Sequence, residues 1–150
     1  MTDGDRLAAA RGRRTDLRVA LGRLEQTLAM PAPGREAEWL TAAGARAYDL
    51  VIALEQHFEV TEGEDGLFEE ILQEAPRLAH AIDGLRHDHD RLRDQATALR
   101  DQITDSQTDP VSVDALRKQA VALMVELVEH RHRGADLVYS AFNIDIEAAD

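Results

Sequence analysis

The sequence predicts an all-α protein that folds as one up-down-up-down four-helix bundle. Hydrophobic residues make up 44% of the chain and aromatic residues only 4%, with few β-branched runs, which is the composition of packed helices. Apolar residues recur at helical spacing in four long segments. Connections of about four to six residues between them favour antiparallel neighbours. A length of 150 residues fits a single domain over residues 1–150.

A turn rich in proline separates the first two predicted helices. The first helix spans about 5–29 and is expected to be frayed at its start. It ends at the segment MPAPG, residues 30–34, because proline has no backbone N–H to donate to the helix and glycine readily adopts turn conformations. The second helix spans about 35–62, and Gly63 is its candidate C-cap.

The third predicted helix is broken near Ala75. After the turn at residues 63–66, Asp65 is placed to cap a short helical piece, and Pro76 then restarts the helix, which continues to about Asp105.

The fourth helix leads into the C-terminal tail. Asp109 or Ser112 is its candidate N-cap. In the tail, residues 143–150, we expect Ile144 and Ile146 to dock on the bundle and the last residues to be disordered.

Composition narrows the possible partners and ligands. The formal net charge of -12 would repel a phosphate backbone, so nucleic acid is not an expected partner. The absence of cysteine excludes disulfides, thiolate catalysis and iron–sulfur clusters. No run is apolar for long enough to span a bilayer. We expect a cytoplasmic protein with no membrane partner, whose available metal ligands are histidine and carboxylate.

Three histidines fall on the apolar faces of three different predicted helices. A single inward histidine is more often a hydrogen-bonded core residue than a ligand. Three of them on facing helices are the means by which bundle cores build metal sites, provided that antiparallel registry brings them to one level. The three stripes are Leu50, Leu54, His57; Leu78, Ile82, Leu85, His89, Leu92; and Leu116, Ala120, Leu123, Leu127, His130, Gly134, Leu137.

This pattern resembles the hemerythrin-like, or HHE cation-binding, family over nearly the whole chain. Its members have one histidine on the first helix, His-x-x-x-Glu on the second, one histidine on the third, and His-x-x-x-Glu or His-x4-Asp on the fourth. His57, His89 and His130 match the histidines of the second, third and fourth helices. The resemblance implies a site for two irons, bridged by carboxylates, that binds dioxygen or nitric oxide.

The sequence departs from the family pattern at three positions. Thr61 follows His57 by four residues, and Gly134 follows His130 by four, where the family has glutamates. On the first helix, leucine spacing puts Arg14 in the place of the first histidine, and arginine is not a metal ligand. Without bridging carboxylates a mononuclear site is favoured over a dinuclear one.

Two functional hypotheses follow. In the first, His57, His89, His130 and Glu62 hold one non-heme metal ion, iron or another single metal, that binds or senses a small diatomic such as dioxygen or nitric oxide. In the second, the chain is a metal-free pseudo-hemerythrin that serves as a helical interaction protein, and Arg14 pairs with a carboxylate, either Glu62 or Asp136.

Other signals are weaker. His132, at the edge of the fourth helix's apolar face, is either a rim residue or a spare ligand. His87-Asp88 resembles the metal-binding pair of phosphohydrolases, but His87 is expected to point away from the stripe that contains His89. Gly134 either leaves room for a ligand or water beside His130 or permits close helix packing. Enzymatic activity and oligomeric state stay open.

Overall fold

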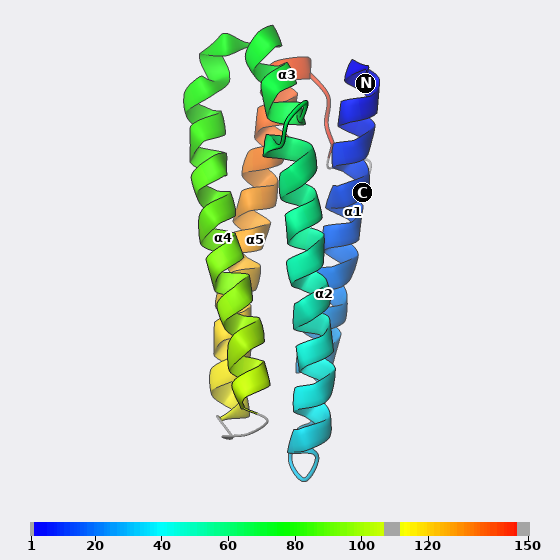
Figure 1. The fold of residues 1–150 in the computed structure, drawn as a ribbon, viewed down its shortest axis with the longest axis vertical. Coiled ribbons are helices and arrows are strands. Elements are labelled where there is room, and N and C mark those ends of the chain that lie inside the picture. The colour runs from blue at the N-terminus through cyan, green and yellow to red at the C-terminus, as the bar shows by residue number, and fades with distance from the viewer. Residues whose placement is uncertain (1, 107–111, 147–150) are drawn as a thin grey trace.

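A computed structural model, described for residues 2–106 and 112–146, confirms the all-α bundle. Four long helices alternate in direction along a common axis (Figure 1). A short helix and a 3-10 turn connect the second long helix to the third at one end of the bundle. The elements are α1 (Asp3–Leu28), α2 (Glu36–Glu62), α3 (Leu67–Glu74), η1 (Pro76–Leu78), α4 (Ala79–Asp105) and α5 (Val113–Phe142).

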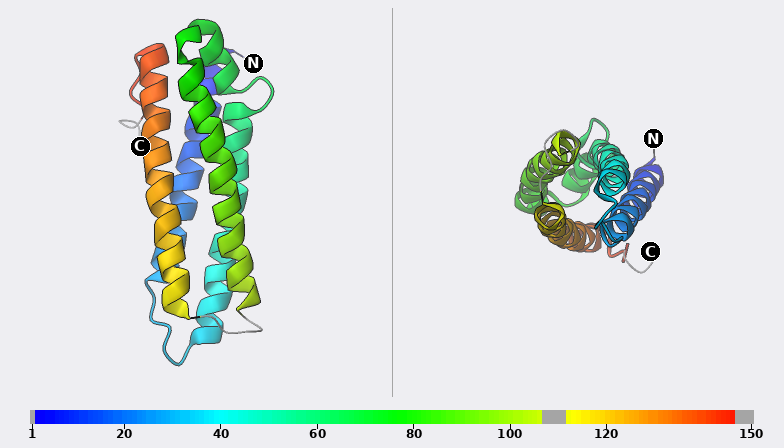
Figure 2. Two further views of the ribbon diagram at one scale, coloured as in Figure 1. Left: turned by 90° about the vertical axis from the view of Figure 1, so that its left-hand side faces the viewer. Right: turned by 90° about the horizontal axis from the view of Figure 1, so that it is seen from below.

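The helices form a ring in chain order. Viewed along the axis, α1, α2, α4 and α5 follow one another around a common core (Figure 2). Because the directions alternate, the C-terminal part of α2 lies beside the N-terminal part of α4 and the C-terminal part of α5. The ring therefore brings the three inward-facing histidines toward one level of the bundle.

The first helix begins two residues earlier than predicted and has a capped start. The Thr2 side chain accepts a hydrogen bond from the backbone N–H of Asp5, and the Asp5 carboxylate accepts one from the backbone N–H of Thr2. This reciprocal capping box satisfies two donors that would otherwise be unpaired.

The predicted cap of the short helix is wrong. Gly66, and not Asp65, occupies the N-cap position of α3, and no side chain caps it. Asp65 adopts a left-handed conformation with φ 58°, and its carboxylate accepts a hydrogen bond of 3.2 Å from Arg6 on α1. The residue therefore ties the α2–α3 turn to α1.

The ends of the last helix largely follow the sequence prediction. Ser112 occupies the N-cap position of α5, although its side chain makes no capping bond, and Asp109 lies outside the described residues. After Asn143 the chain turns back, and Ile146 is buried with Ile144 packed nearby, which confirms that the tail docks. The prediction of disorder falls on residues 147–150, which are outside the described part.

The core consists of two apolar clusters along the bundle axis. The larger cluster is built by α1, α2, α4 and α5 and includes Leu92, which is fully buried. The smaller cluster lies at the α3 end, where the tail also packs. Among the described helices, none combines the length and apolar character that crossing a bilayer requires.

Replacing Leu92 by alanine is expected to lower the free energy of unfolding by about 2–5 kcal/mol, because the side chain is fully buried and its loss leaves a cavity. Urea denaturation measures this change. Val121→Ala is the matched control: the Val121 side chain is 56% exposed, so its loss should change stability by no more than about 0.5 kcal/mol. Equal losses would contradict the assigned core.

Candidate metal centre

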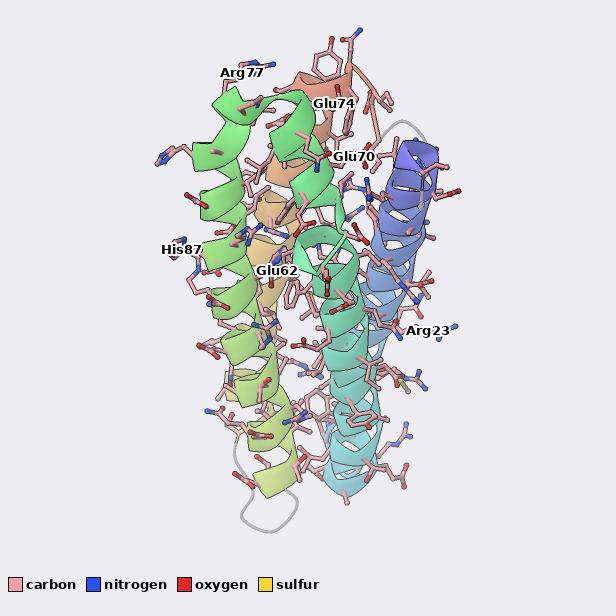
Figure 3. All side chains as sticks on the ribbon, turned by 45° about the horizontal axis from the view of Figure 1, so that its top comes forward. Arg23, Glu62, Glu70, Glu74, Arg77 and His87 are labelled. Atoms are coloured by element: carbon pink, nitrogen blue, oxygen red, sulfur yellow. The ribbon has the colours of Figure 1, made fainter. Side chains whose placement is uncertain are left out.

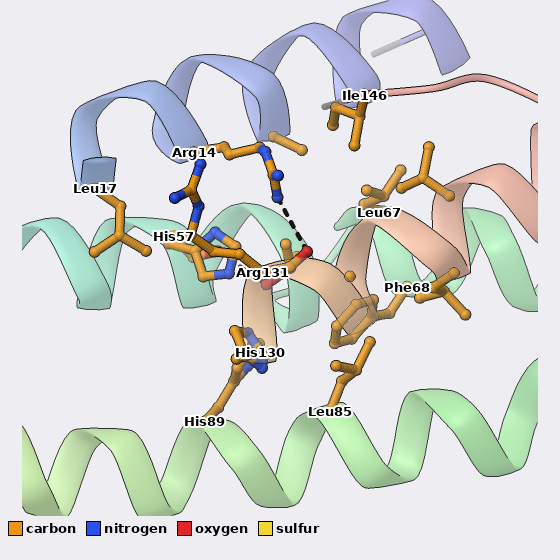
Figure 4. Close-up of a pocket in the computed structure, with 15 residues that line it drawn as sticks. Arg14, Leu17, His57, Leu67, Phe68, Leu85, His89, His130, Arg131 and Ile146 are labelled. Atoms are coloured by element: carbon orange, nitrogen blue, oxygen red, sulfur yellow. Dashed lines mark hydrogen bonds between the residues drawn. The ribbon is translucent and has the colours of Figure 1, made fainter. Parts of the chain in front are cut away.

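Three histidines from three helices meet inside the bundle. His57 on α2, His89 on α4 and His130 on α5 each offer a ring nitrogen, and these atoms all lie within 4.8 Å of one another. The distances between ring centroids are 5.5 Å for His57 and His89, 5.7 Å for His57 and His130, and 4.9 Å for His89 and His130. Figure 4 shows the rings around one cavity.

His89 is buried without any hydrogen bond. Its exposure is 0%, and neither ring nitrogen has a hydrogen-bond partner among the described residues. Two phenyl rings hold it instead: Phe58 stacks on it with centroids 4.2 Å apart, and Phe68 with centroids 5.7 Å apart. Buried polar atoms without hydrogen-bond partners cost free energy, so a ligand bound to these nitrogens would remove part of that cost.

His57 is the least buried of the three histidines that line the cavity. It is half-buried, and its Nδ1 also lacks a hydrogen-bond partner in the described part of the chain. Periodicity predicted a place in the apolar stripe of α2. The fully buried position at this level of the helix belongs to the neighbouring Phe58.

His130 is anchored by a carboxylate. Its Nδ1 lies 3.2 Å from Oδ2 of Asp88, and the same oxygen accepts a hydrogen bond of 3.1 Å from Nε of Arg133. The other oxygen of Asp88 accepts a bond of 2.9 Å from Arg91. This is the carboxylate–histidine arrangement that commonly orients metal-binding imidazoles.

The predicted ligand Glu62 lies outside the cluster of ring nitrogens. Its carboxylate is 3.5 Å from Nδ1 of His89 and 3.9 Å from Arg93. Burial raises the pKa of Glu62, and the charge of Arg93 offsets only part of that rise. Glu62, the last residue of α2, therefore approaches one ring nitrogen of His89 without forming a hydrogen bond to it.

Burial keeps all three histidines neutral at pH 7. Loss of water contact, reinforced by the nearby charges of His130 and Arg14, lowers the pKa of His57 from 6.5 to about 3. Burial also lowers the pKa of His89 strongly, with further contributions from the other two histidines. Burial lowers the pKa of His130 as well, although its hydrogen bond to Asp88 opposes the shift. Neutral imidazoles are the form that binds metal.

The three positions that depart from the family pattern all border the histidine cavity. This cavity has a volume of about 40 Å³, and Arg14, Thr61 and Gly134 line it together with the histidines. Arg14 is buried and donates a hydrogen bond of 3.2 Å to the backbone oxygen of Arg131. The Thr61 hydroxyl donates to the backbone oxygen of His57, one turn back, at 2.8 Å. A Cβ built at Gly134 would meet nothing within 4 Å.

The other candidate residues face solvent. His132 and Asp136 are exposed on α5 and do not border the cavity. His87 is exposed on α4 and projects away from the bundle, as predicted (Figure 3). Prediction from sequence missed Asp88, Phe58 and Phe68 as parts of the site. The sequence did contain one indication of Asp88: it is a carboxylate directly before the inward-facing His89. Its position around α4 brings it to the side that faces α5.

The donor set fits one metal ion. Three ligands at about 2.1 Å from a tetrahedral ion are about 3.4 Å apart. Ring nitrogens within 4.8 Å can therefore converge by modest side-chain rotation. Imidazole suits iron, zinc and copper, whereas two bridged irons require carboxylates. No carboxylate belongs to the cluster found among the described residues.

The comparison with known families agrees with this site. The chain matches the family model of the hemerythrin HHE cation binding domain over residues 15–141. Because that range covers most of the chain, the protein belongs to the hemerythrin HHE family. The match begins one residue after Arg14 and includes Thr61 and Gly134. No match was found among curated proteins or among solved structures. The family is named for cation binding, and the three histidines form a cluster that can hold a metal ion.

The lowered pKa values predict a loss of stability in acid for the metal-free protein. As pH falls below about 6.5, the histidines of the unfolded chain bind protons, whereas those of the folded protein stay neutral because their pKa values are lowered. Protonation therefore favours the unfolded state. The free energy of unfolding decreases toward pH 4 and has its full value above pH 7. His89→Leu should remove up to about 1.4 kcal/mol of this loss per pH unit. Urea unfolding of chelator-treated protein at several pH values measures it.

Leu92→Met is the control for this experiment. It changes a buried side chain one turn further along α4 and removes no titratable group, so it should keep the wild-type dependence on pH. If wild type and His89→Leu lose stability equally between pH 7 and 4, His89 is not held neutral in the fold.

Introducing the family's ligands at the three positions where this sequence lacks them should let the bundle hold two irons. The combined variant Arg14→His, Thr61→Glu and Gly134→Glu supplies one imidazole and two carboxylates around the same cavity. The space beside Gly134 accepts a Cβ, and glycine is the poorer helix former by about 0.5 kcal/mol or more. Iron stoichiometry and the absorption of an oxo-bridged ferric pair are the measurements.

A folded triple variant that still takes up one iron or none would contradict the assigned positions. Circular dichroism establishes the fold before iron is counted. Gly134→Ala is the matched control: it gives the same gain in helix propensity without a ligand, so it should leave iron uptake at the wild-type level.

Proposed function

We propose that the protein binds a single metal ion, preferably iron, through His57, His89 and His130, and that this site takes up a small diatomic ligand such as dioxygen or nitric oxide. The observation that carries the proposal is a set of three neutral, buried imidazoles whose ring nitrogens converge, with those of His89 unpartnered among the described residues. Family membership supports it, since the family is one of cation-binding domains.

The cavity beside the histidines suits a ligand of this size. A water molecule needs about 10–15 Å³ of such volume, so about 40 Å³ admits a small molecule and excludes an organic substrate of ordinary size. Away from the histidines and Arg14, much of the wall is apolar and includes Leu67, Phe68 and Leu137. Held by three histidines, an iron ion would supply open coordination positions to such a ligand.

The chain's own residues prepare the site. The apolar wall limits the entry of water, and burial keeps the imidazoles in the form that carries a lone pair. Stacking on Phe58 fixes the ring of His89, and Asp88 fixes the ring of His130. Little rearrangement is then needed on binding, which favours affinity.

One observation favours the second candidate, a metal-free interaction protein. Arg14 is buried at the cavity wall, where the family pattern has a histidine ligand, and its charge opposes a cation nearby. Metal analysis of protein purified without chelator separates the two candidates. One equivalent of metal supports the site, and protein that stays empty when titrated with Fe²⁺, Co²⁺ and Zn²⁺ overturns it.

His89→Ala should abolish binding at this site, whereas His87→Ala should leave it unchanged. His89 is fully buried in the cluster, while His87, two residues before it, is exposed on the outer face of α4. Titration with Co²⁺ measures the change, because the visible absorption of the ion depends on the number and geometry of its ligands. Equal losses in both variants would place the bound metal on the surface and contradict the proposal.

A further inference from the structure

Asp88 is the one carboxylate that contacts a histidine of the cluster by a hydrogen bond among the described residues. It is 6% exposed and lies on α4 next to His89, but faces α5. Two guanidinium groups fix its position: Arg133 on α5 donates to Oδ2, and Arg91, one turn along α4, donates to Oδ1. Both oxygens are thereby used, and Oδ2 also faces Nδ1 of His130.

This geometry determines which nitrogen of His130 carries the proton. Both oxygens of Asp88 accept hydrogen bonds from guanidinium groups, Oδ2 from Arg133 and Oδ1 from Arg91, and these charged donors hold the carboxylate as an anion. An ionised carboxylate only accepts hydrogen bonds, so Nδ1 of His130 must donate. In a neutral imidazole whose Nδ1 carries the proton, the lone pair is on Nε2.

We propose that Asp88 is the positioning residue of this site, which holds His130 in the Nδ1–H tautomer and keeps the lone pair of Nε2 available to a metal ion in the cavity. The affinity part of this inference rests on the proposed function, and the tautomer part does not.

The other two histidines have no comparable anchor among the described residues. The carboxylate of Glu62 lies 3.5 Å from Nδ1 of His89 without forming a hydrogen bond, and Nδ1 of His57 is also unpartnered there. Among the three rings, His130 is therefore the one that a hydrogen bond to a described carboxylate orients before any ligand arrives.

The test uses the isosteric change Asp88→Asn. Without a fixed negative acceptor, His130 should populate the Nε2–H tautomer, which leaves no lone pair on Nε2. Loss of such an outer partner typically weakens metal affinity 10–100-fold. Nitrogen-15 NMR of the metal-free protein at pH 7.5 distinguishes the two tautomers, and titration with Co²⁺ or Zn²⁺ measures the affinity.

Asp90→Asn is the matched control. Asp90 is an exposed carboxylate on the same helix that pairs with Arg93 at 3.1 Å and does not contact the cluster. This variant should keep both the tautomer of His130 and the wild-type affinity. In Asp88→Asn, the tautomers of His57 and His89 should also stay as in wild type, since neither ring contacts Asp88 through a hydrogen bond.

Each outcome decides the inference. An Nδ1–H signal for His130 in wild type, lost in Asp88→Asn and kept in Asp90→Asn, supports it. An Nε2–H signal in wild type, or an unchanged tautomer in Asp88→Asn, overturns it. If the variant does not fold, the wild-type spectrum by itself still establishes which nitrogen of His130 carries the proton. A wild-type protein with the expected tautomer but no affinity for metal would reject the proposed function and retain Asp88 as the residue that orients His130.

Discussion

The structure depends on the placement of three imidazoles in an otherwise apolar bundle. They lie where the two apolar clusters meet. At this level of the bundle, polar ring nitrogens take the place of the apolar side chains that fill the core above and below. A buried nitrogen without a partner is costly, and a charged imidazole there would cost more. The surrounding residues reflect this constraint: phenyl rings pack against His89, and a carboxylate contacts His130.

The same constraint supports the proposal of one cation and not two. Metal ions carry positive charge into a medium of low dielectric, where carboxylate ligands normally neutralise it. At the positions where the family has those ligands, Thr61 bonds to its own helix and Gly134 offers no side chain. Arg14 adds a positive charge at the wall. In the proposed site, three neutral histidines beside the Arg14 guanidinium would supply no negative charge to hold a second metal ion.

The carboxylates that approach His130 and His89 differ in their charge and in their contact with the ring. Asp88 is held as an anion by two arginines and contacts His130 directly. Glu62 approaches His89 at 3.5 Å, and burial makes it a weaker acid. The bundle thus orients one histidine by a charged hydrogen bond and another mainly by aromatic packing, which couples the cluster to the core at Phe58 and Phe68.

The sequence by itself determined the bundle and the inward direction of the three histidines. Helical periodicity and proline breaks are local properties, so the ends of α2, α4 and α5 and the inward faces of His89 and His130 could be predicted within a residue or two. Only the tertiary structure decided which groups touch those rings. The contact from Asp88 to His130 joins residues 42 positions apart and depends on how α4 and α5 are rotated against each other. Spacing within one helix carries no information about that rotation, which is why the contact of Asp88 with His130 could not be predicted from the sequence.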